Sequence, residues 1–431
     1  MSLARADVVS GSSMFHSILK RRGVQLLLLS VAMAAGGYVR TAISPLQETM
    51  RVALSMSDNQ MALLQGPLIG IPVVLASVPL GLLIDRYSRA RLLFSLILVS
   101  FLGSLLTALA PSFMLLFVAR GLSGLVGLST IPVSYSFLAD LYPPAQRGRA
   151  TTVICVGQLA GISSAFALGG ALLTMRGHAT EGWRWAMLWM SAPLGVSVLL
   201  MFVLREPSRT GTAMSRPTAR RVWEVLKHHR AIVVPLAVGA ILVETAVGSI
   251  LIWAAPMLSR SFSLSPDRIG TVMALTTLIG GTVGPIVGGT LADLCQRTGG
   301  PRRTVIVLSV LALLSAPTDL YALVSAGLSV STMLVAGMIL MQMIFVIAIT
   351  LFTIVIPDEV RGLCTSMFVA MNLLFVFAVA PVMVSVLSGA LGGPMMIGQA
   401  LTIICLSSSL FAASIFAIGS RNLARIGIGA Q

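Results

Sequence analysis

Three charged residues lie deep inside long apolar segments, where a charge needs either a partner or a functional role. A fourth, Asp319, lies further out in the ninth segment, close to the expected membrane surface. Arg40 lies in the second half of the first apolar segment, Arg120 in the first half of the fourth, and Glu244 near the middle of the seventh. A charged side chain at the centre of a bilayer costs at least about 2.5–3.5 kcal/mol on insertion scales. Arginine suits bidentate binding of carboxylate or phosphate, and a buried carboxyl group can take up and release a proton. These residues therefore indicate anion binding and proton coupling.

Each of the three also has a structural interpretation. Arg40 could snorkel to the membrane surface, Arg120 could hydrogen-bond to the first helix, and Glu244 could be a neutral group bonded within the second half of the chain. We expect Arg40 to bind substrate or to line a cavity. For Arg120 and Glu244 both interpretations stay open, and Glu244 is the candidate for proton coupling.

Uncharged polar residues in the apolar segments form a second group, made of Tyr38, Gln65, Tyr135, Gln158, Gln342 and Asn372. Residues of this kind more often bond one membrane helix to another than contact a ligand. From this group we take Tyr38, Tyr135 and Asn372 as candidate substrate contacts, together with Arg40 and Arg120.

No catalytic, cofactor-binding or metal-binding pattern accompanies these residues in the sequence. Ser129 and Ser136 have no His or Asp partner within an apolar segment, which nucleophilic chemistry would need. The sequence has no phosphate-binding P-loop, and its four cysteines form no C-x-x-C pair. We therefore predict a protein that is not an enzyme and that needs no cofactor.

The composition places these residues in a membrane. Of the 431 residues, 56% are apolar and only 10% are charged, and the mean hydropathy is +0.96. Soluble domains carry about 25% charged residues, so this chain could not cover a soluble surface. The apolar runs are long and lack period-two alternation, which argues against an outer-membrane barrel. The sequence predicts an all-α polytopic membrane protein.

Twelve segments are long enough to cross a bilayer, which takes about 20 apolar residues each. The expected spans are 24–46, 60–84, 90–110, 113–141, 150–175, 184–204, 231–256, 269–293, 303–325, 331–356, 361–389 and 396–419. The longest polar break divides them into an N-terminal six-helix bundle (1–204), a cytoplasmic linker (205–230) and a C-terminal six-helix bundle (231–431). Within the linker, 220–229 predict a short interfacial helix with Trp223 and Leu226 toward lipid.

The basic residues indicate how the chain is oriented. The net charge is +15, but the basic residues lie between apolar segments, so they indicate topology and not nucleic-acid binding. If the N-terminus is cytoplasmic, only five of the 29 basic residues lie outside, and Arg40 and Arg120 lie within spans. The positive-inside rule then predicts an inner-membrane protein with both termini in the cytoplasm.

The two halves of the chain repeat the same landmarks in the same order. The segment LSMSDNQ (54–60) matches LSPDRIG (264–270), Gly81-x-x-x-Asp85 matches Gly289-x-x-x-Asp293, and the Pro-x-x-x-Arg-Gly segment at 143–148 matches that at 357–362. Three matches in one order indicate two parallel repeats of six helices.

The segment GLLIDRYSRAR (81–91) resembles the loop signature of the major facilitator superfamily, Gly-x-x-x-Asp-Arg-x-x-Arg. We expect Gly81 to let two helices approach closely. Asp85 follows at a helix C-terminus, where the helix dipole disfavours an unpaired anion, so it needs Arg86, Arg89 or a neighbouring helix as a partner. Such a pair can latch one conformer and break in the other. The alternative is that these charges only enforce topology.

The second copy of this signature, GGTLADLCQR (288–297), keeps Gly289, Asp293 and Arg297. It has Leu294 where the first copy has Arg86, so a weaker latch is expected there.

The whole chain is similar to the bacterial spinster-like transporters of that superfamily. The similarity is carried by SDNQMALLQG (57–66), ARGLSGLVGLSTIPVSYSFLADLYPPAQRGRA (119–150), FSLSPDRIGTVMAL (262–275) and VRGLCTSMFVAMNLLFVFAVAPVMV (360–384). The resemblance also implies an acid before Arg40 and another seven residues after Arg120. This sequence has Val39 and Gly127 at those positions, so both membrane acids of the first half are missing.

These observations predict a secondary transporter that works by alternating access, with substrate bound between the two bundles. Three functions remain in competition: a spinster-like carrier of an amphipathic organic anion or lysolipid, a proton-coupled exporter of drugs or small metabolites, and a membrane receptor that transports nothing. The partners expected are a small-molecule or lipid substrate, the lipid bilayer and, if transport is coupled, protons. We expect a monomer.

Overall fold

The computed structural model describes residues 22–176, 182–207, 219–324 and 327–426. Within these ranges every regular element is a helix. The first half of the chain forms α2 (Arg22–Thr41), η1 (Ser44–Leu46), α3 (Gln47–Ala53), α4 (Asp58–Gln65), α5 (Pro67–Arg86), α6 (Arg89–Leu109), α7 (Phe113–Leu141), α8 (Pro144–Arg176), α9 (Gly182–Met190) and α10 (Ala192–Met201).

The second half begins with α11 (Ala219–His228), which leads directly into the next helix. It continues with α12 (Arg230–Phe262), α13 (Pro266–Ser315), η2 (Ala316–Asp319), η3 (Tyr321–Leu323), α14 (Gly327–Val355), α15 (Asp358–Leu374), the π-helical turn η4 (Phe375–Val379), α16 (Ala380–Ala390), η5 (Pro394–Met396) and α17 (Ile397–Ile426).

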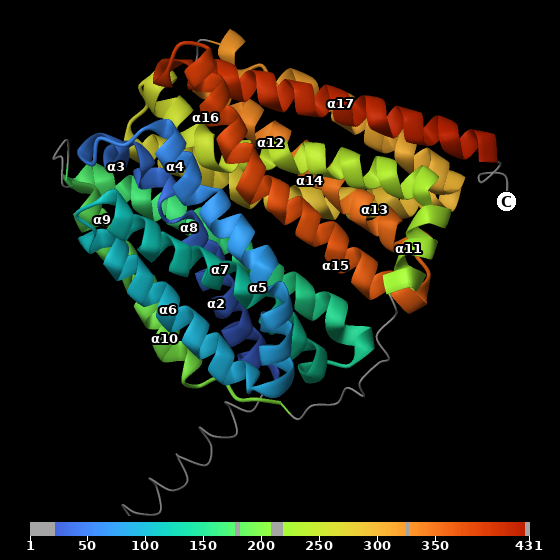
Figure 1. Ribbon diagram of the computed structural model, residues 1–431, viewed down its shortest axis with the longest axis horizontal. Coiled ribbons are helices and arrows are strands. Elements are labelled where there is room, and N and C mark those ends of the chain that lie inside the picture. Colours follow the sequence, from blue (N-terminus) through green and yellow to red (C-terminus); the bar gives the residue numbers. More distant parts are fainter. Residues whose placement is uncertain (1–21, 177–181, 208–218, 325–326, 427–431) are drawn as a thin grey trace, which may run out of the picture.

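These helices form two bundles that meet at one end and spread apart at the other (Figure 1). The bundles meet near α3, α4 and α16, and we name this the α3 end. They spread toward α11, which marks the α11 end. Eleven stretches are long and apolar enough to span a membrane, and one of them, Pro266–Leu323, contains two such helices. It is broken at Gly300, where φ is 61° and ψ is −157°. The prediction of twelve membrane helices in two groups of six is confirmed.

Helix ends explain one of the repeated sequence landmarks. Arg147 donates from Nη2 to the Ala139 carbonyl at 2.8 Å and from Nε to the Tyr142 carbonyl at 3.0 Å, at the end of α7. Its counterpart Arg361 donates from Nε to the Ile356 carbonyl at 3.2 Å, just after α14. The last carbonyls of a helix lack partners and carry negative partial charge, so an arginine that folds back onto them stabilises the turn.

Small residues hold α2 tightly against α8. A Cβ atom on Gly161 would lie 2.0 Å from the Ala34 carbonyl oxygen, and one on Gly157 would lie 2.2 Å from Ser30 Oγ. These two glycines lie one helical turn apart on α8, so this face lets the two backbones approach closely. The segment 157–170 is therefore a helix-packing face, as its composition indicates.

The same segment continues into the contact between the two bundles at the α3 end. Ser163 Oγ lies 2.9 Å from Thr277 Oγ1 of α13. A Cβ on Gly170 would lie 2.9 Å from Gly270 Cα, so α8 and α13 touch backbone to backbone there. Both contacts exclude larger side chains, and they close the α3 end between α8 and α13.

Two expectations from the sequence are wrong for this conformation. A Cβ atom on Gly81 or on Gly289 would meet no heavy atom within 4 Å, so neither glycine lies at a close helix contact. The helix predicted within the linker does form, as α11, and its Trp223 is exposed. Leu226, however, is only partly exposed and contacts the core instead of facing lipid, because it lies on the same face of α11 as the buried Val222 and Val225.

The α2–α8 contact yields a stability prediction. Gly161→Val is expected to lower the thermal unfolding midpoint of the purified protein by several degrees, because its side chain would force α2 and α8 apart and overpacking costs about 1–3 kcal/mol. Gly289→Val is the matched control, since it adds the same β-branched residue to a helix where no atom lies nearby. Equal midpoints for the two variants would contradict the packing role of Gly161.

Candidate functional site

Arg40 and Arg120 lie side by side where α2 meets α7. Arg120 is 2% exposed and donates from Nη1 to the Val39 carbonyl at 2.8 Å and from Nη2 to the Arg40 carbonyl. Arg120 therefore ties α7 to α2, which is the structural alternative considered for it. Its Nε is buried and has no hydrogen-bond acceptor among the described residues.

The positions of the two missing acids touch each other beside these arginines. A Cβ atom on Gly127 would lie 2.9 Å from Val39 Cγ1 and 3.1 Å from the Gly36 carbonyl oxygen. Apolar contact thus fills the space where the family resemblance implies two carboxylates. In the part of the chain that the structure describes, neither Arg40 nor Arg120 forms an ion pair.

Arg40 reaches across to the second bundle. Its guanidinium carbon lies 5.1 Å from the ring centroid of Phe377 in η4, within the range of a cation–π contact. Phe377 belongs to an apolar cluster that joins the bundles, made of Ile69, Leu128, Val376 and Phe377. The side chain of Arg40 has no hydrogen-bond acceptor within the described ranges, so its donors are available to a ligand.

The second bundle contributes a carboxyl and an amide from neighbouring helices. α12 and α15 both begin at the α11 end, because α11 leads into α12 and its Arg221 pairs with Glu359 at the start of α15, at 3.3 Å. A Cβ atom on Gly248 of α12 would lie 2.5 Å from the Val376 carbonyl oxygen, so the two residues are in close contact. Glu244 precedes Gly248 by four residues, and Asn372 precedes Val376 by four. Glu244 and Asn372 therefore both lie one helical turn nearer the α11 end than this contact, at a similar level to each other.

Both groups keep unused hydrogen-bonding capacity. Asn372 donates from Nδ2 to the Phe368 carbonyl at 2.7 Å, while its Oδ1 is buried and without a partner among the described residues. Glu244 Oε1 and the Tyr38 hydroxyl are likewise buried and without a partner among the described residues, and the Tyr38 residue is 3% exposed. Buried polar atoms without partners are uncommon in folded proteins and often mark a binding site.

Tyr135 lies elsewhere. It follows Arg120 on α7 by about four turns, or roughly 22 Å at 1.5 Å per residue. Its hydroxyl lies 3.2 Å from Cys155 Sγ of α8. The structure therefore brings Arg40, Arg120 and Tyr38 together, with Phe377 opposite them and Glu244 and Asn372 in the other bundle, and it leaves Tyr135 toward the α11 end.

Arg89 of the loop signature is engaged within the first bundle. It is 3% exposed and pairs through Nη1 with Asp140 of α7 at 2.5 Å and through Nε with Glu206, just after α10, at 2.7 Å. Nη1 also donates to the Ser136 carbonyl at 3.0 Å. Arg89 thus joins the ends of α6, α7 and α10.

The sequence does not predict the part that Glu206 plays in this cluster, because Glu206 belongs to no repeated pattern. Its carboxylate also accepts from the Ala90 amide at 2.8 Å and from Ser88 Oγ at 3.0 Å. Partial burial raises the pKa of this carboxyl, but these hydrogen bonds and the Arg89 guanidinium outweigh that effect and lower the pKa below its ordinary value. Glu206 therefore stays ionised and holds the Arg89 cluster together.

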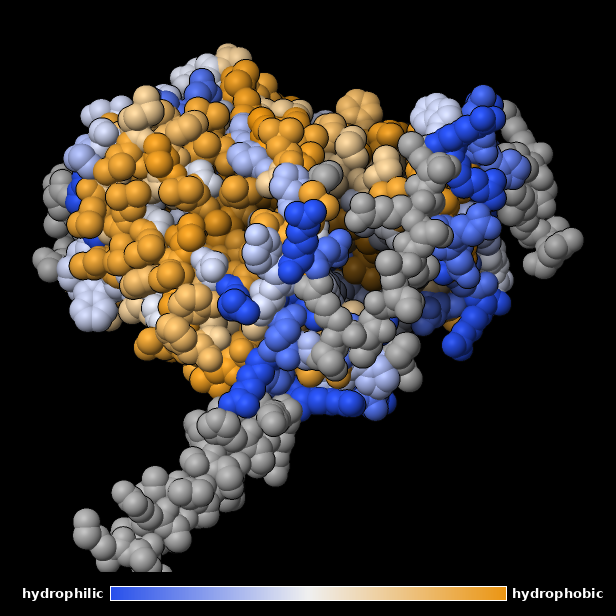
Figure 2. All heavy atoms as spheres, turned by 60° about the horizontal axis from the view of Figure 1, so that its bottom comes forward, coloured by the Kyte–Doolittle hydropathy of each residue, from blue (hydrophilic) through white to orange (hydrophobic). Residues whose placement is uncertain are grey.

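The other latch candidates lie on the surface at the α11 end. Asp85 and Arg86 are exposed at the end of α5, and Asp293 and Arg297 are exposed on α13. On the face of the molecule turned forward in Figure 2, hydrophilic side chains gather around a hollow between the bundles.

At the α3 end a second ionic cluster joins the two bundles. Arg260 of α12 is bound by Glu48 Oε2 at 2.6 Å and by Asp58 Oδ2 at 2.7 Å, both from the first bundle. It also donates to the Pro394 carbonyl at 3.0 Å, and Arg51 pairs with Glu48 at 2.7 Å. The sequence held a signal for this cluster: opposite charges near the ends of helices expected on one side of the membrane.

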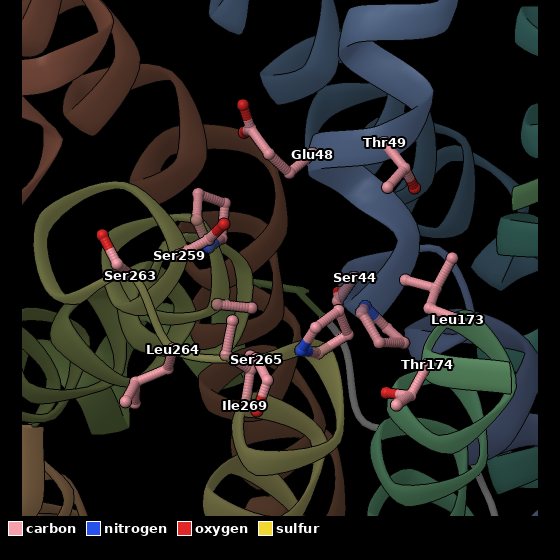
Figure 3. A pocket seen from close by; sticks show the side chains of 14 residues that line it. Ser44, Glu48, Thr49, Leu173, Thr174, Ser259, Ser263, Leu264, Ser265 and Ile269 are labelled. Carbon is pink, nitrogen blue, oxygen red and sulfur yellow. The ribbon is translucent and has the colours of Figure 1, made fainter. Parts of the chain in front are cut away.

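A cavity of about 590 Å³ lies beside this cluster. It is lined from the first bundle by Ser44, Glu48, Thr49 and Thr174 and from the second by Ser259, Ser263 and Ser265, among others (Figure 3). Since its walls come from both bundles, its shape depends on how closely they meet.

Comparisons with known proteins agree with this fold. A family model described as Major Facilitator Superfamily matches residues 28–381. Multidrug resistance protein B homolog of Mycobacterium tuberculosis is 35% identical over 123 residues, which is 28% of this chain and 22% of that protein. Multidrug resistance protein 3 of Bacillus subtilis is 29% identical over 134 residues, or 31% of this chain and 25% of that protein. These matches cover about a quarter of each relative.

Solved structures match over nearly the whole chain. A bacterial homolog to the human lysosomal transporter Spinster, in an inward-facing and unoccupied conformation, has a TM-score of 0.79 at 20% identity and covers 94% of this chain and 98% of that chain. The nucleoside transporter NupG has a TM-score of 0.72 at 12% identity, over 92% of this chain and 99% of that one. At these identities the likeness shows a shared fold. Because the family model spans most of the chain, the protein belongs to the Major Facilitator Superfamily of transporters.

Proposed function

We propose that this protein is a secondary transporter that moves an amphipathic organic anion by alternating access. The observation that carries the proposal is the pair of Arg120, which is buried, and Arg40, which is partly buried, at the junction of the bundles with no acid beside them among the described residues. A carboxylate or phosphate of the substrate would supply the missing charge and accept from the free donors of Arg40.

The surroundings of Arg40 favour a substrate with an apolar part. Its guanidinium rests against Phe377, whose neighbours Ile69, Leu128 and Val376 are apolar. A substrate bound there would place its anionic group on arginine and its hydrocarbon part against this cluster. This combination fits a lysolipid or a similar organic anion, and it is consistent with the likeness to the spinster homolog.

We infer that the structure is the inward-open state. The α3 end is closed by the Arg260 cluster and by the α8–α13 contact, while the bundles spread toward the α11 end (Figure 1). The basic residues of the loops support a cytoplasmic α11 end under the positive-inside rule. The proposed arrangement is an inner-membrane monomer with both termini cytoplasmic and a linker at 205–230 between bundles 1–204 and 231–431.

Two further roles complete the proposal. Asp85 and Arg86, with Asp293 and Arg297 in the second copy, act as a latch when the cytoplasmic ends come together, because all four are exposed at that end. Glu244 couples transport to protons: it lies in the second bundle at a level similar to that of Asn372, its Oε1 is buried and without a partner among the described residues, and a bound anion would favour its neutral form.

Proton-coupled export of drugs is the second candidate, and the curated relatives with multidrug names favour it. It differs from the first in the charge of the substrate. A drug exporter of the usual kind would bind organic cations, which two unpaired arginines would repel.

The anion proposal is tested by ligand stabilisation of the purified protein, measured as a thermal shift against organic anions, organic cations and lysolipids. An anion or lysolipid is expected to raise the midpoint. Arg40→Lys should reduce that shift although it keeps the charge, because lysine lacks the planar pair of donors. Arg268→Lys, an exposed position on α13, is the control and should bind as wild type. Stabilisation by cations alone would favour the drug-exporter alternative.

The closure at the α3 end is tested with a cysteine reporter. Ser163→Cys, in a background without the four native cysteines, lies in the closed α8–α13 contact. Adding Arg260→Gln removes the charge that joins Glu48 and Asp58, so the outward-open state should be more populated. Labelling by a membrane-impermeant maleimide from outside should rise several-fold. Arg268→Gln should leave it unchanged, and labelling that ignores Arg260→Gln would show that other contacts close this end.

Proton coupling is tested by transport of the ligand found in the screen into proteoliposomes with and without an imposed pH gradient. Wild type should accumulate the ligand in response to the gradient. Glu244→Gln should only equilibrate the ligand across the membrane, because the glutamine side chain does not take up and release a proton in this pH range. Wild-type transport that ignores the gradient would make the protein a uniporter with Glu244 as a static helix contact. That result would leave the anion proposal standing.

A further inference from the structure

A groove of about 510 Å³ runs along the outside of the second bundle between α12 and α17 at the α11 end. Its walls are apolar and its end is polar. The lining residues are Arg230, Ala231, Val234, Pro235, Val238, Ile415, Ile418 and Asn422. None of them belongs to the candidate substrate site.

Close helix contacts form the floor of this groove. A Cβ atom on Gly419 would lie 2.8 Å from Pro235 Cβ, and one on Gly239 would lie 2.3 Å from the Phe416 ring. These contacts bring α12 and α17 together, and the side chains beside them stand outward as walls. Val234 is 54% exposed and Ile418 is 53% exposed. In a membrane protein such a surface faces lipid.

The dimensions match one lipid leaflet. From Arg230 to Val238 the α12 wall measures about 12 Å at 1.5 Å per residue. Half of a hydrocarbon core of about 30 Å is roughly 15 Å. An acyl chain lying in the groove would therefore have its headgroup beside Arg230 and Asn422.

The polar end carries unused positive charge. Arg230 is exposed and forms no ion pair with any other described residue. α11 ends immediately before it and presents the exposed Lys227 and Trp223, the latter 68% exposed. Basic and aromatic residues at the end of a membrane helix favour anionic lipid headgroups.

We propose that this groove binds one anionic phospholipid from the leaflet at the α11 end. The Arg230 guanidinium and the Asn422 amide donate to the phosphate, and the acyl chain lies along Val234, Val238 and Ile418. The site is separate from substrate transport, so it holds whether or not the proposed function does. Its occupant is a lipid, because an apolar wall on the membrane face offers nothing to a free anion.

A second groove supplies the comparison. It lies between α16 and α17, measures about 640 Å³, and is lined by Ala378, Val379, Val382, Met383, Val386, Leu387, Ala390 and Ile404. It has the apolar wall without a charged residue. It should accept hydrocarbon with no preference for the headgroup.

The test is native mass spectrometry of the detergent-purified protein with added dioleoyl phosphatidylglycerol or dioleoyl phosphatidylcholine. Wild type should retain phosphatidylglycerol about fivefold more than phosphatidylcholine, the factor that corresponds to about 1 kcal/mol for one basic residue at an anionic surface. Arg230→Gln should bring this ratio close to one. Val238→Trp should lower retention of both lipids, because indole fills the groove.

Three controls decide the outcome. Arg268→Gln removes an exposed arginine elsewhere, and Met383→Trp fills the uncharged groove; both should keep the wild-type ratio. Inorganic phosphate alone should neither bind nor displace the lipid. A wild-type ratio of one, or an equal loss of the ratio in Arg230→Gln and Arg268→Gln, would overturn the proposal.

Discussion

The arrangement of this molecule depends on the cost of placing charge in a bilayer. Arg120 donates hydrogen bonds to two carbonyls of α2, and these bonds offset the free energy of burying its charge. The same bonds fix α7 against α2. For Arg40 the cation–π contact with Phe377 of the other bundle offsets only part of this free-energy cost. A charged side chain without a partner in its own bundle interacts instead with the groups that lie between the bundles. The same physical demand therefore produces a structural contact from one of two neighbouring arginines and a candidate binding site from the other.

Ion pairs are used differently at the two ends of the molecule. At the α3 end Arg260 joins acids of the opposite bundle, and that cluster keeps the bundles together. At the α11 end Arg89 is bound by Asp140 of its own bundle and by Glu206, at the start of the linker that follows α10. The first cluster must break for the α3 end to open, whereas the second can persist because it moves as part of one body. Such a division suits bundles that rock as rigid units.

The contact between Val39 and Gly127 changes the electrostatics of the first bundle. Two carboxylates there would balance the two arginines internally. A valine methyl group against a glycine leaves the arginines uncompensated and lets α2 and α7 approach closely. Within α12, in the second bundle, the one acid is Glu244. Charge compensation, and with it any coupling to protons, then depends on the relation between bundles.

The sequence by itself determined the twelve membrane helices, the division into two repeats and the buried charges, because a bilayer forces each crossing segment to satisfy its backbone locally and to be apolar along its length. It also located Tyr38, Arg40, Arg120, Glu244 and Asn372 as unusual residues, four of which keep buried polar atoms without partners. Only the tertiary structure decided which of them meet. Hydropathy sets how deep a residue lies, but side-chain packing sets how each helix is rotated and which helix it touches. For that reason Phe377 beside Arg40, Glu206 beside Arg89, and the distance of Tyr135 from the arginines could not be read from the chain.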